Sequence, residues 1–311
     1  MEEKVVKVEN LSHRYSVQWA VKDISFEISS KGIMGLLGSN GAGKSTTMNI
    51  ICGVLKPTAG EVWINGINLR NNPVEAKKNI GFLPQKAPLY LDFTVNEYLT
   101  YCAHLRLMEP KEVKRAVESA KARCGITHFS NRLIRNLSGG YQQRVGIAQA
   151  IVHNPKFVVL DEPTNGLDPN QILEVRRLIK EIAEERAVLL STHILSEVQA
   201  TCQQIKMVEN GQMVFSGSIE DFDNYIKPTS LLLGLHTPIA VNELQFEGVK
   251  QIEMVGEKRF RLVYDGSEDT VQRIAEACVN KHWGLTELTV EKSSLDAVFA
   301  KLSKEARTEN L

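Results

Sequence analysis

The stretch Gly38-Ser-Asn-Gly-Ala-Gly-Lys-Ser45 decides the fold of this chain. It matches the pattern G-x-x-x-x-G-K-[ST], in which glycines allow successive backbone N–H groups to converge on one point. The apolar run Ile33–Leu37 before it is typical of a fully buried strand, and Ser45–Leu55 after it has apolar residues at helical spacing until Pro57. Strand, glycine loop and helix thus follow in the order that phosphate binding requires, because a helix N-terminus carries about half a positive charge.

The loop also predicts which side chains hold a nucleotide. We expect Lys44 to reach the β- and γ-phosphates and the Ser45 hydroxyl to bind Mg²⁺. The alternative is a glycine-rich structural turn, but the motif and its context agree on a phosphate site.

A second cluster follows another buried strand. The apolar run Phe157-Val-Val-Leu160 ends in Asp161 and Glu162. Two adjacent acids at such a position divide naturally into a metal holder, Asp161, and a group that polarises the attacking water, Glu162. Acids at strand ends are often merely solvated, and it is the glycine loop upstream that favours the catalytic interpretation.

Composition limits the remaining possibilities. The 311 residues correspond to about two domains at ordinary domain size. The 37 Lys and Arg residues balance 37 Asp and Glu residues, which gives no general electrostatic reason to bind nucleic acid. Five scattered cysteines without a C-x-x-C pair argue against disulfides or zinc and fit a reducing cytosol. Met1-Glu-Glu-Lys lacks the apolar core of a signal peptide and no segment is expected to span a membrane, so a membrane role would need another chain.

Local patterns predict two domains, residues 1–217 and 218–311. In the first, Asp23–Ile28 alternates as an antiparallel strand does, and residues from about 92 to 153 form a helical insertion that opens with the capping-box pattern Thr94-Val-Asn-Glu97. Further helices are expected at Lys111–Arg123, at Tyr141–His153, after Asp168-Pro169 and at Leu195–Cys202. A strand is expected at Ala187–Leu190, and Asn210-Gly211 is expected to form a type I′ hairpin turn.

The second domain is expected to be a small α/β unit. Its predicted strands begin near Leu231 and lie at Gln251–Met254, Arg259–Tyr264 and Leu288–Val290, and its predicted helices lie at Thr270–Trp283 and Ser294–Leu302. The glycine loop has no second copy, which indicates one nucleotide-binding unit with an extension.

The segment Leu137-Ser-Gly-Gly-Tyr141 reveals a family resemblance. Together with the glycine loop, Gln85, Asn165-Gly-Leu-Asp168 and His193, it makes residues of about 3 to 217 resemble the ATP-binding cassette (ABC) ATPases. The resemblance implies an α/β P-loop NTPase fold, with a mixed sheet core, an antiparallel β subdomain and a helical subdomain. Asn165–Pro169 and the terminal Ser294–Leu302 most resemble ATPase subunits of export-type transporters for drugs, polysaccharides or gliding machinery.

The resemblance implies a dimer that encloses two ATP molecules. Ser138 would cap a helix whose N-terminus, with Gly139 and Gly140, points its amides at the γ-phosphate bound by the partner subunit. The partner is a second copy of the chain or a related ATPase. The residues implied on the glycine loop are Gly38, Ser39, Asn40, Gly41, Ala42, Gly43, Lys44, Ser45 and Thr46.

Further roles are also implied by the resemblance. Tyr15 would stack on adenine, with Trp19 as a rival, a contact worth about 1–3 kcal/mol if it resembles other base–aromatic stacking. Gln85 would touch Mg²⁺ or the attacking water and sense the γ-phosphate. His193 would donate to the γ-phosphate, and Asp168 would act as a helix cap and as an inter-subunit contact.

One residue departs from the family pattern. Tyr141 stands where the commonest form of the signature has Gln. Because the amides and Ser138 are expected to bind the phosphate, we expect activity to survive, with Gln142 in partial compensation.

The resemblance implies that the chain hydrolyses ATP and couples this to transport, with export favoured. The subunit would lie on the cytoplasmic face of the membrane, beside an integral permease. The segment from about Lys86 to Leu107 would receive the permease's coupling helix. Its apolar contacts would come from Pro84, Pro88, Leu89, Tyr90 and Phe93, unless these form an internal core. The alternatives are an importer ATPase, a soluble cassette ATPase serving ribosomes, repair or iron–sulfur assembly, a metabolite kinase, and a nonhydrolytic binding module.

Overall fold

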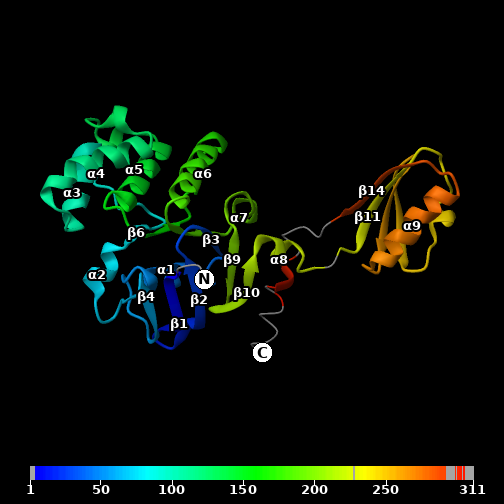
Figure 1. The fold of residues 1–311 in the computed structure, drawn as a ribbon, viewed down its shortest axis with the longest axis horizontal. Helices are drawn as coiled ribbons and strands as arrows, with labels where there is room; N and C mark the ends of the chain where they lie inside the picture. The colour runs from blue at the N-terminus through cyan, green and yellow to red at the C-terminus, as the bar shows by residue number, and fades with distance from the viewer. Residues whose placement is uncertain (1–3, 227, 292–297, 299, 303, 305–311) are drawn as a thin grey trace. The chain divides into compact units, whose positions relative to one another are not determined.

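The computed structural model describes residues 4–226, 228–291, 298, 300–302 and 304. The chain divides into two compact units, the first ending at Ile219 and the second covering Glu220–Lys304 (Figure 1). Among the described residues, every helix is too short or too polar to cross a bilayer.

A six-stranded mixed sheet forms the centre of the first unit. Its order is β10 (Gln212–Ser218), β9 (Gln204–Glu209), β3 (Gly32–Leu37), β8 (Ala187–Thr192), β7 (Phe157–Asp161) and β6 (Ile80–Leu83). All neighbours are parallel except β9 and β10, and β7 and β8 are buried along their whole length, as near-continuous apolar runs predict. The register aligns Leu37 with Thr192 and Asp161 with Ser191, so the loops after β3, β7 and β8 leave one edge together.

An antiparallel sheet packs beside this core. Its order is β2 (Gln18–Ser29), β1 (Lys4–Tyr15), β4 (Ala59–Ile64) and β5 (Ile67–Asn68). The predicted alternation is confirmed, because Ile24, Phe26 and Ile28 are buried. These side chains share one hydrophobic cluster with Met48 and Ile51 of α1 (Lys44–Ile51), which joins the two sheets.

Helix α1 is shorter than the sequence predicts. It ends at Ile51 rather than Leu55, because Gly53 adopts a left-handed φ of 67°. A residue with a side chain would be strained at this φ, which is why glycine suits the position.

The helical insertion forms one end of the first unit, away from β1, β2 and β4 (Figure 1). It contains α3 (Val95–Leu105), α4 (Pro110–Arg123) and α5 (Gly139–Ile151), with short 3₁₀ turns at Thr127–Phe129 and Ile134–Asn136; α2 (Pro73–Lys78) precedes it. The capping box is confirmed, since the Thr94 hydroxyl accepts from Glu97 N at 3.2 Å and the Glu97 carboxylate accepts from Thr94 N at 2.8 Å. Helix α5 begins and ends two residues earlier than predicted, because its N-cap is Ser138.

Local sequence patterns predict most of the remaining helices and turns of this unit. Asp168 caps α6 (Pro169–Ala183), and α7 (Leu195–Thr201) follows β8. Asn210 and Gly211 both have positive φ, 50° and 76°, which confirms the type I′ turn between β9 and β10. Helix α8 (Ile219–Asp223) follows β10, and all of it but Ile219 belongs to the second unit.

The second unit is an antiparallel sheet with one long helix. The strand order is β12 (Val249–Gly256), β13 (Arg259–Tyr264), β11 (Ser230–Leu235) and β14 (Leu285–Glu291), and α9 (Glu268–Asn280) packs on it around a core that includes Leu231, Leu233, Phe260 and Ile274. A 3₁₀ turn at Val241–Leu244 precedes β12. Helix α9 ends three residues before the predicted Trp283, and β14 is longer than predicted. The predicted Ser294–Leu302 helix lies largely outside the described residues, although residues 298 and 300–302 are helical.

Candidate functional site

The glycine loop connects β3 to α1 at the shared strand edge. A Cβ atom at Gly38 would lie 2.2 Å from the Val208 carbonyl oxygen, and one at Gly43, whose φ is 109°, would lie 2.5 Å from the Ala20 carbonyl oxygen. Both positions therefore require glycine, because the neighbouring atoms are backbone. This packing fixes the loop against the strands behind it.

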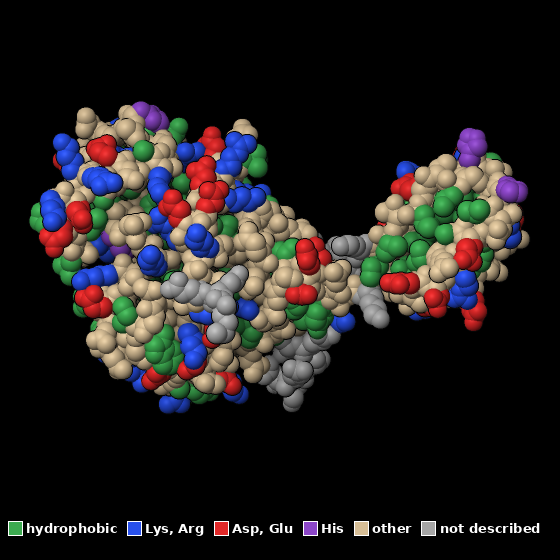
Figure 2. Space-filling view, in the orientation of Figure 1, with side chains coloured by type: hydrophobic (Ala, Val, Ile, Leu, Met, Phe, Trp, Pro, Cys, Tyr) green, Lys and Arg blue, Asp and Glu red, His purple; other side chains and the backbone are tan. Residues whose placement is uncertain are grey.

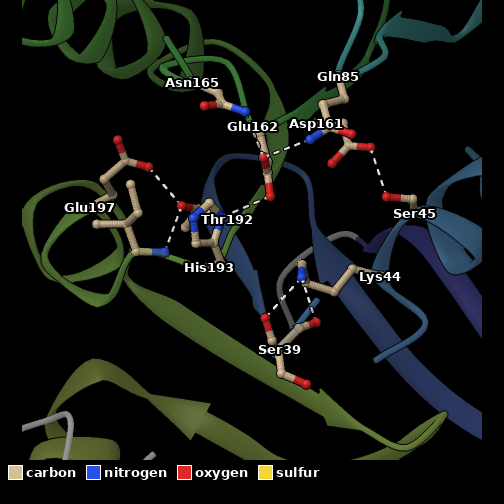
Figure 3. Close-up of polar contacts among 12 residues, drawn as sticks. Ser39, Lys44, Ser45, Gln85, Asp161, Glu162, Asn165, Thr192, His193 and Glu197 are labelled. Carbon is tan, nitrogen blue, oxygen red and sulfur yellow. Dashed lines mark hydrogen bonds and ion pairs between the residues drawn. The ribbon is translucent and has the colours of Figure 1, made fainter. Parts of the chain in front are cut away.

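Lys44 is held over the loop by two of the loop's own carbonyl groups. Its Nζ donates to the carbonyl oxygens of Gly38 at 2.8 Å and Ser39 at 3.0 Å (Figure 3). Burial lowers the pKa of Lys44, while the charges of Glu162 and Asp161 oppose that shift. A cation is thus held against the glycine loop.

A hydroxyl and a carboxylate meet beside this lysine. Ser45, in the first turn of α1, donates from Oγ to Oδ2 of Asp161 at 3.1 Å (Figure 3). Asp161 ends β7 and is buried, and this burial raises its pKa. Two oxygen groups of the kind that Mg²⁺ prefers therefore converge from two different elements.

Glu162 lies at the centre of a second polar group. Its Oε1 lies 2.9 Å from Nδ1 of His193, and its Oε2 accepts from Nε2 of Gln85 at 2.9 Å and from Nδ2 of Asn165 at 3.1 Å (Figure 3). Glu162 has a left-handed φ of 48°, and its N–H donates to the Ser191 carbonyl at 3.0 Å. The structure thus brings Glu162, His193 and Gln85 together from three strand ends, with local backbone strain at the central acid.

The sequence reasoning missed a buried acid that supports this group. Glu197 of α7 is 3% exposed and accepts from Oγ1 of Thr192 at 2.7 Å and from Oγ1 of Thr164. Thr192 directly precedes His193, and Thr164 follows Glu162 by two positions. The only sequence signal is an acid on the buried face of a short helix, beside Val198 and Thr201, where an apolar residue is usual. For Asn165, the sequence indicates only that it belongs to the motif Asn165-Gly-Leu-Asp168.

Ser138 is the N-cap residue of α5, as expected, but its side chain makes no capping hydrogen bond to the described residues. Gly140 lies against Gln171 of α6, and among the described residues no hydrogen bond joins Ser138, Gly139 or Gly140 to the glycine loop. One chain by itself therefore does not bring the two predicted phosphate-binding segments together.

Tyr141 and Gln142 have separate roles behind this segment. The Tyr141 ring packs edge-on against Phe129, with centroids 4.6 Å apart, and the guanidinium of Arg144 lies 5.6 Å from its centroid. Gln142 donates from Nε2 to the carbonyls of Ile134 and Leu137, both at 3.2 Å. Gln142 thus holds the backbone that precedes α5, and its partial compensation for Tyr141 stays a prediction.

Tyr15 and Trp19 lie on the hairpin formed by β1 and β2. They are 53% and 45% exposed, respectively. Tyr15 makes an edge contact with His13, whereas the Arg14 guanidinium lies 5.8 Å from the Trp19 ring centroid. The Asp168 carboxylate accepts from the N–H groups of Asn170 and Gln171, each at 3.0 Å, which confirms its local role as a helix cap.

Comparison with known proteins identifies the family. The ABC transporter family model matches residues 21–165. The bacitracin transport ATP-binding protein BcrA of Bacillus licheniformis is 35% identical over 212 residues, which cover 68% of this chain and 68% of that protein. This chain belongs to the ABC transporter ATP-binding proteins. It is an ABC ATPase and the ATP-binding subunit of a transporter, as the sequence predicts.

Two further ABC proteins extend the comparison. The linearmycin resistance ATP-binding protein LnrL of Bacillus subtilis is 27% identical over 307 residues, 96% of this chain and 98% of that one, so the similarity includes the second unit. The dimeric structure of the ATP-binding cassette MJ0796, in a post-hydrolysis state with ADP and Pi, matches with a TM-score of 0.62 and 26% identity. It covers 69% of this chain and 98% of that one.

Proposed function

We propose that this ATPase subunit powers export through a separate membrane permease, as one of two subunits that close around two ATP molecules. The observation that carries the hydrolytic part is the convergence of Gln85, Glu162 and His193 beside the Ser45–Asp161 pair. The export direction is supported by relatives named for bacitracin transport and linearmycin resistance, the second of which aligns over almost the whole chain.

In this proposal the glycine loop holds the triphosphate. The N–H groups of residues 38–46 and the Lys44 ammonium bind the β- and γ-phosphates, and Tyr15 stacks on adenine. Tyr15 is preferred over Trp19 because Arg14 lies over the Trp19 ring, whereas Tyr15 has only an edge contact.

The oxygen groups beside the loop fit a magnesium ion. Ser45 and Asp161 would hold it, with Gln85 near enough to contribute. Among the described residues no group of three or more His, Cys, Asp or Glu side chains could hold a metal alone, so phosphate and water oxygens would complete the shell. Bound Mg²⁺ would supply charge neutralisation for the phosphate oxygens.

The catalytic step is assigned to the second polar group. Glu162 orients the attacking water and accepts its proton, because its carboxylate is fixed by donors from three segments. His193 then donates to the γ-phosphate, where Lys44 also stabilises the developing negative charge. Hydrolysis breaks the bond between the β- and γ-phosphates, so an intact ATP no longer links the two subunits, and release of ADP and phosphate reopens the dimer.

Dimerisation completes each site. In the part of the chain that the structure describes, Ser138, Gly139 and Gly140 have no hydrogen bond to the glycine loop, and the Ser138 side chain makes no capping bond that would compete with a phosphate. We therefore assign these residues to the ATP of the partner subunit, whether a second copy or a related ATPase, and Asp168 to the contact between subunits. The dimeric MJ0796 cassette supports this arrangement.

The permease is proposed to dock on the segment between Lys86 and Leu107. Apolar side chains are exposed along it, including Tyr90 at 53%, Leu105 at 62% and Leu107 at 67%. The Tyr90 ring contacts Phe93 and Tyr101, with centroids 5.5 and 5.7 Å apart. An exposed aromatic cluster of this kind is suited to an apolar helix from a partner.

The subunit would then lie on the cytoplasmic face of the membrane, with no nucleic-acid partner. Lys and Arg side chains are interspersed with Asp and Glu side chains over the visible face of the first unit, without a single-sign stripe (Figure 2). Such a mixture gives little attraction for a polyanionic backbone.

The direction of transport is tested in proteoliposomes that contain the ATPase and its permease. With the ATPase on the outer face, an exporter moves substrate into the lumen when MgATP is added, whereas an importer removes it. Purification from detergent-solubilised membranes tests the partner, since recovery only with ribosomes or scaffold proteins would contradict the proposed permease.

A further inference from the structure

Glu209 is a buried acid that the proposed hydrolysis does not use. It ends β9, is 2% exposed, and accepts from Oγ of Ser39 at 2.7 Å through Oε1. Its Oε2 accepts from Ser39 N at 3.3 Å. A buried carboxylate is costly unless donors compensate it, so its position depends on these two bonds to the second residue of the glycine loop.

The turn that follows Glu209 contacts the same loop again. The Gly211 N–H donates to the Ala42 carbonyl at 2.9 Å. Just before Glu209, the Val208 carbonyl oxygen lies where a Cβ of Gly38 would be. Residues 208–211, which we call the supporting turn, therefore contact the glycine loop near its beginning and its middle.

These contacts reach Lys44 through Ser39. The Lys44 ammonium donates to the carbonyls of Gly38 and Ser39 (Figure 3). The Ser39 hydroxyl in turn donates to Glu209. A loop that is ordered before its ligand arrives loses less conformational freedom on binding, which improves affinity.

We infer that Glu209 is a positioning residue for ATP binding, which fixes the first turn of the glycine loop through Ser39. The inference rests on the proposed nucleotide site. Substitution of Glu209 should therefore raise the dissociation constant and the KM for ATP. It should leave kcat at saturating ATP close to that of the wild type, because Glu209 does not touch the group around Glu162.

The test is ATP titration by calorimetry on the full chain, together with KM and kcat. We expect E209A and S39A each to weaken ATP binding by about tenfold, which is the scale of a hydrogen bond to a charged group. E209Q keeps an acceptor for the Ser39 hydroxyl and should recover part of the affinity. The double variant S39A/E209A should be no weaker than E209A, because the two residues act through one contact.

The matched control is Q203A. Gln203 accepts from the N–H of Ile33 at 2.8 Å through its side-chain oxygen, so it supports the backbone at the opposite end of β3. Its loss should leave ATP affinity unchanged. S39A keeps the experiment interpretable if E209A does not fold.

Two results would overturn the inference. One is wild-type ATP affinity in folded E209A and S39A with only a lower melting temperature, and the other is a fall in kcat at unchanged affinity. K44A distinguishes failure of the role of Glu209 from failure of the proposed nucleotide site. If K44A loses ATP binding while E209A retains it, only the role of Glu209 fails, and if K44A binds ATP normally, the proposed phosphate site fails.

Discussion

The Nδ1 atom of His193 lies 2.9 Å from Oε1 of Glu162. These residues are 31 positions apart. Glu162 directly follows the buried parallel strand β7, and His193 directly follows β8. The other oxygen of Glu162 accepts from Gln85 and Asn165. The proposed base is therefore paired with the very residue that is proposed to contact the γ-phosphate.

E162Q tests this arrangement. Its amide preserves the shape of the side chain but is a poor proton acceptor, so we expect ATP binding to persist while kcat falls by at least about a hundredfold. An ATP-bound dimer should accumulate, which light scattering measures beside the rate of phosphate release. E184Q, at an exposed acid after α6, is the control and should behave as the wild type. Turnover at the wild-type rate in E162Q would remove Glu162 from its assigned role.

Y141Q introduces the residue that is usual at this position in the family. It removes the ring that packs on Phe129 and beneath Arg144, so we expect the free energy of unfolding to fall by about 1–2 kcal/mol. ATP turnover should stay within about threefold of the wild type, since removal of one exposed contact that does not reach the phosphate costs little. Denaturant unfolding and ATPase rates measure the two effects, and Y141F should preserve both. A large loss of turnover in Y141Q would show that the ring itself serves the site.

T94A removes the capping box of α3. The Thr94 hydroxyl accepts from Glu97 N, and its loss leaves that helical N–H without its side-chain partner. We expect a destabilisation of about 1 kcal/mol, measured by denaturant unfolding. T94S retains the hydroxyl and should retain most of the stability. Equal losses in T94A and T94S would point to the methyl group rather than the cap.

His153 is expected to make stability depend on pH. Burial lowers its pKa to about 4, and the nearby positive charge of Arg106 adds to the shift. Its Nε2 lies 2.9 Å from the Ile80 carbonyl oxygen, which the neutral ring can satisfy as a donor. The unfolded chain therefore binds a proton that the folded chain rejects, so this contribution is complete above the ordinary histidine pKa of about 6.5 and is lost as pH falls toward 4.

The expected loss is up to about 3 kcal/mol between pH 6.5 and 4. H153Q keeps a donor for the Ile80 carbonyl and should flatten this part of the curve of unfolding free energy against pH. H104Q, at an exposed histidine of α3, should leave the curve unchanged. An unaltered slope in H153Q would mean that other groups cause the acid sensitivity.

Features that depend on neighbouring residues were determined by the sequence alone. The Thr94–Glu97 capping box, the Asp168 cap and the Asn210-Gly211 turn each close within a few positions, so composition and spacing are sufficient to predict them. The strand, glycine loop and helix around Lys44 are equally local, and they predict the fold class because few architectures place a buried strand before such a loop.

Tertiary structure alone decided which distant groups meet. Glu209 binds Ser39 across 170 positions, and Gln85 reaches Glu162 across 77. These pairings depend on which strands are neighbours and in what register, and nothing in the local pattern of an isolated acid or glutamine specifies that. The separation of Ser138 from the glycine loop is likewise a property of the folded chain, and it is why the proposed site needs a second subunit.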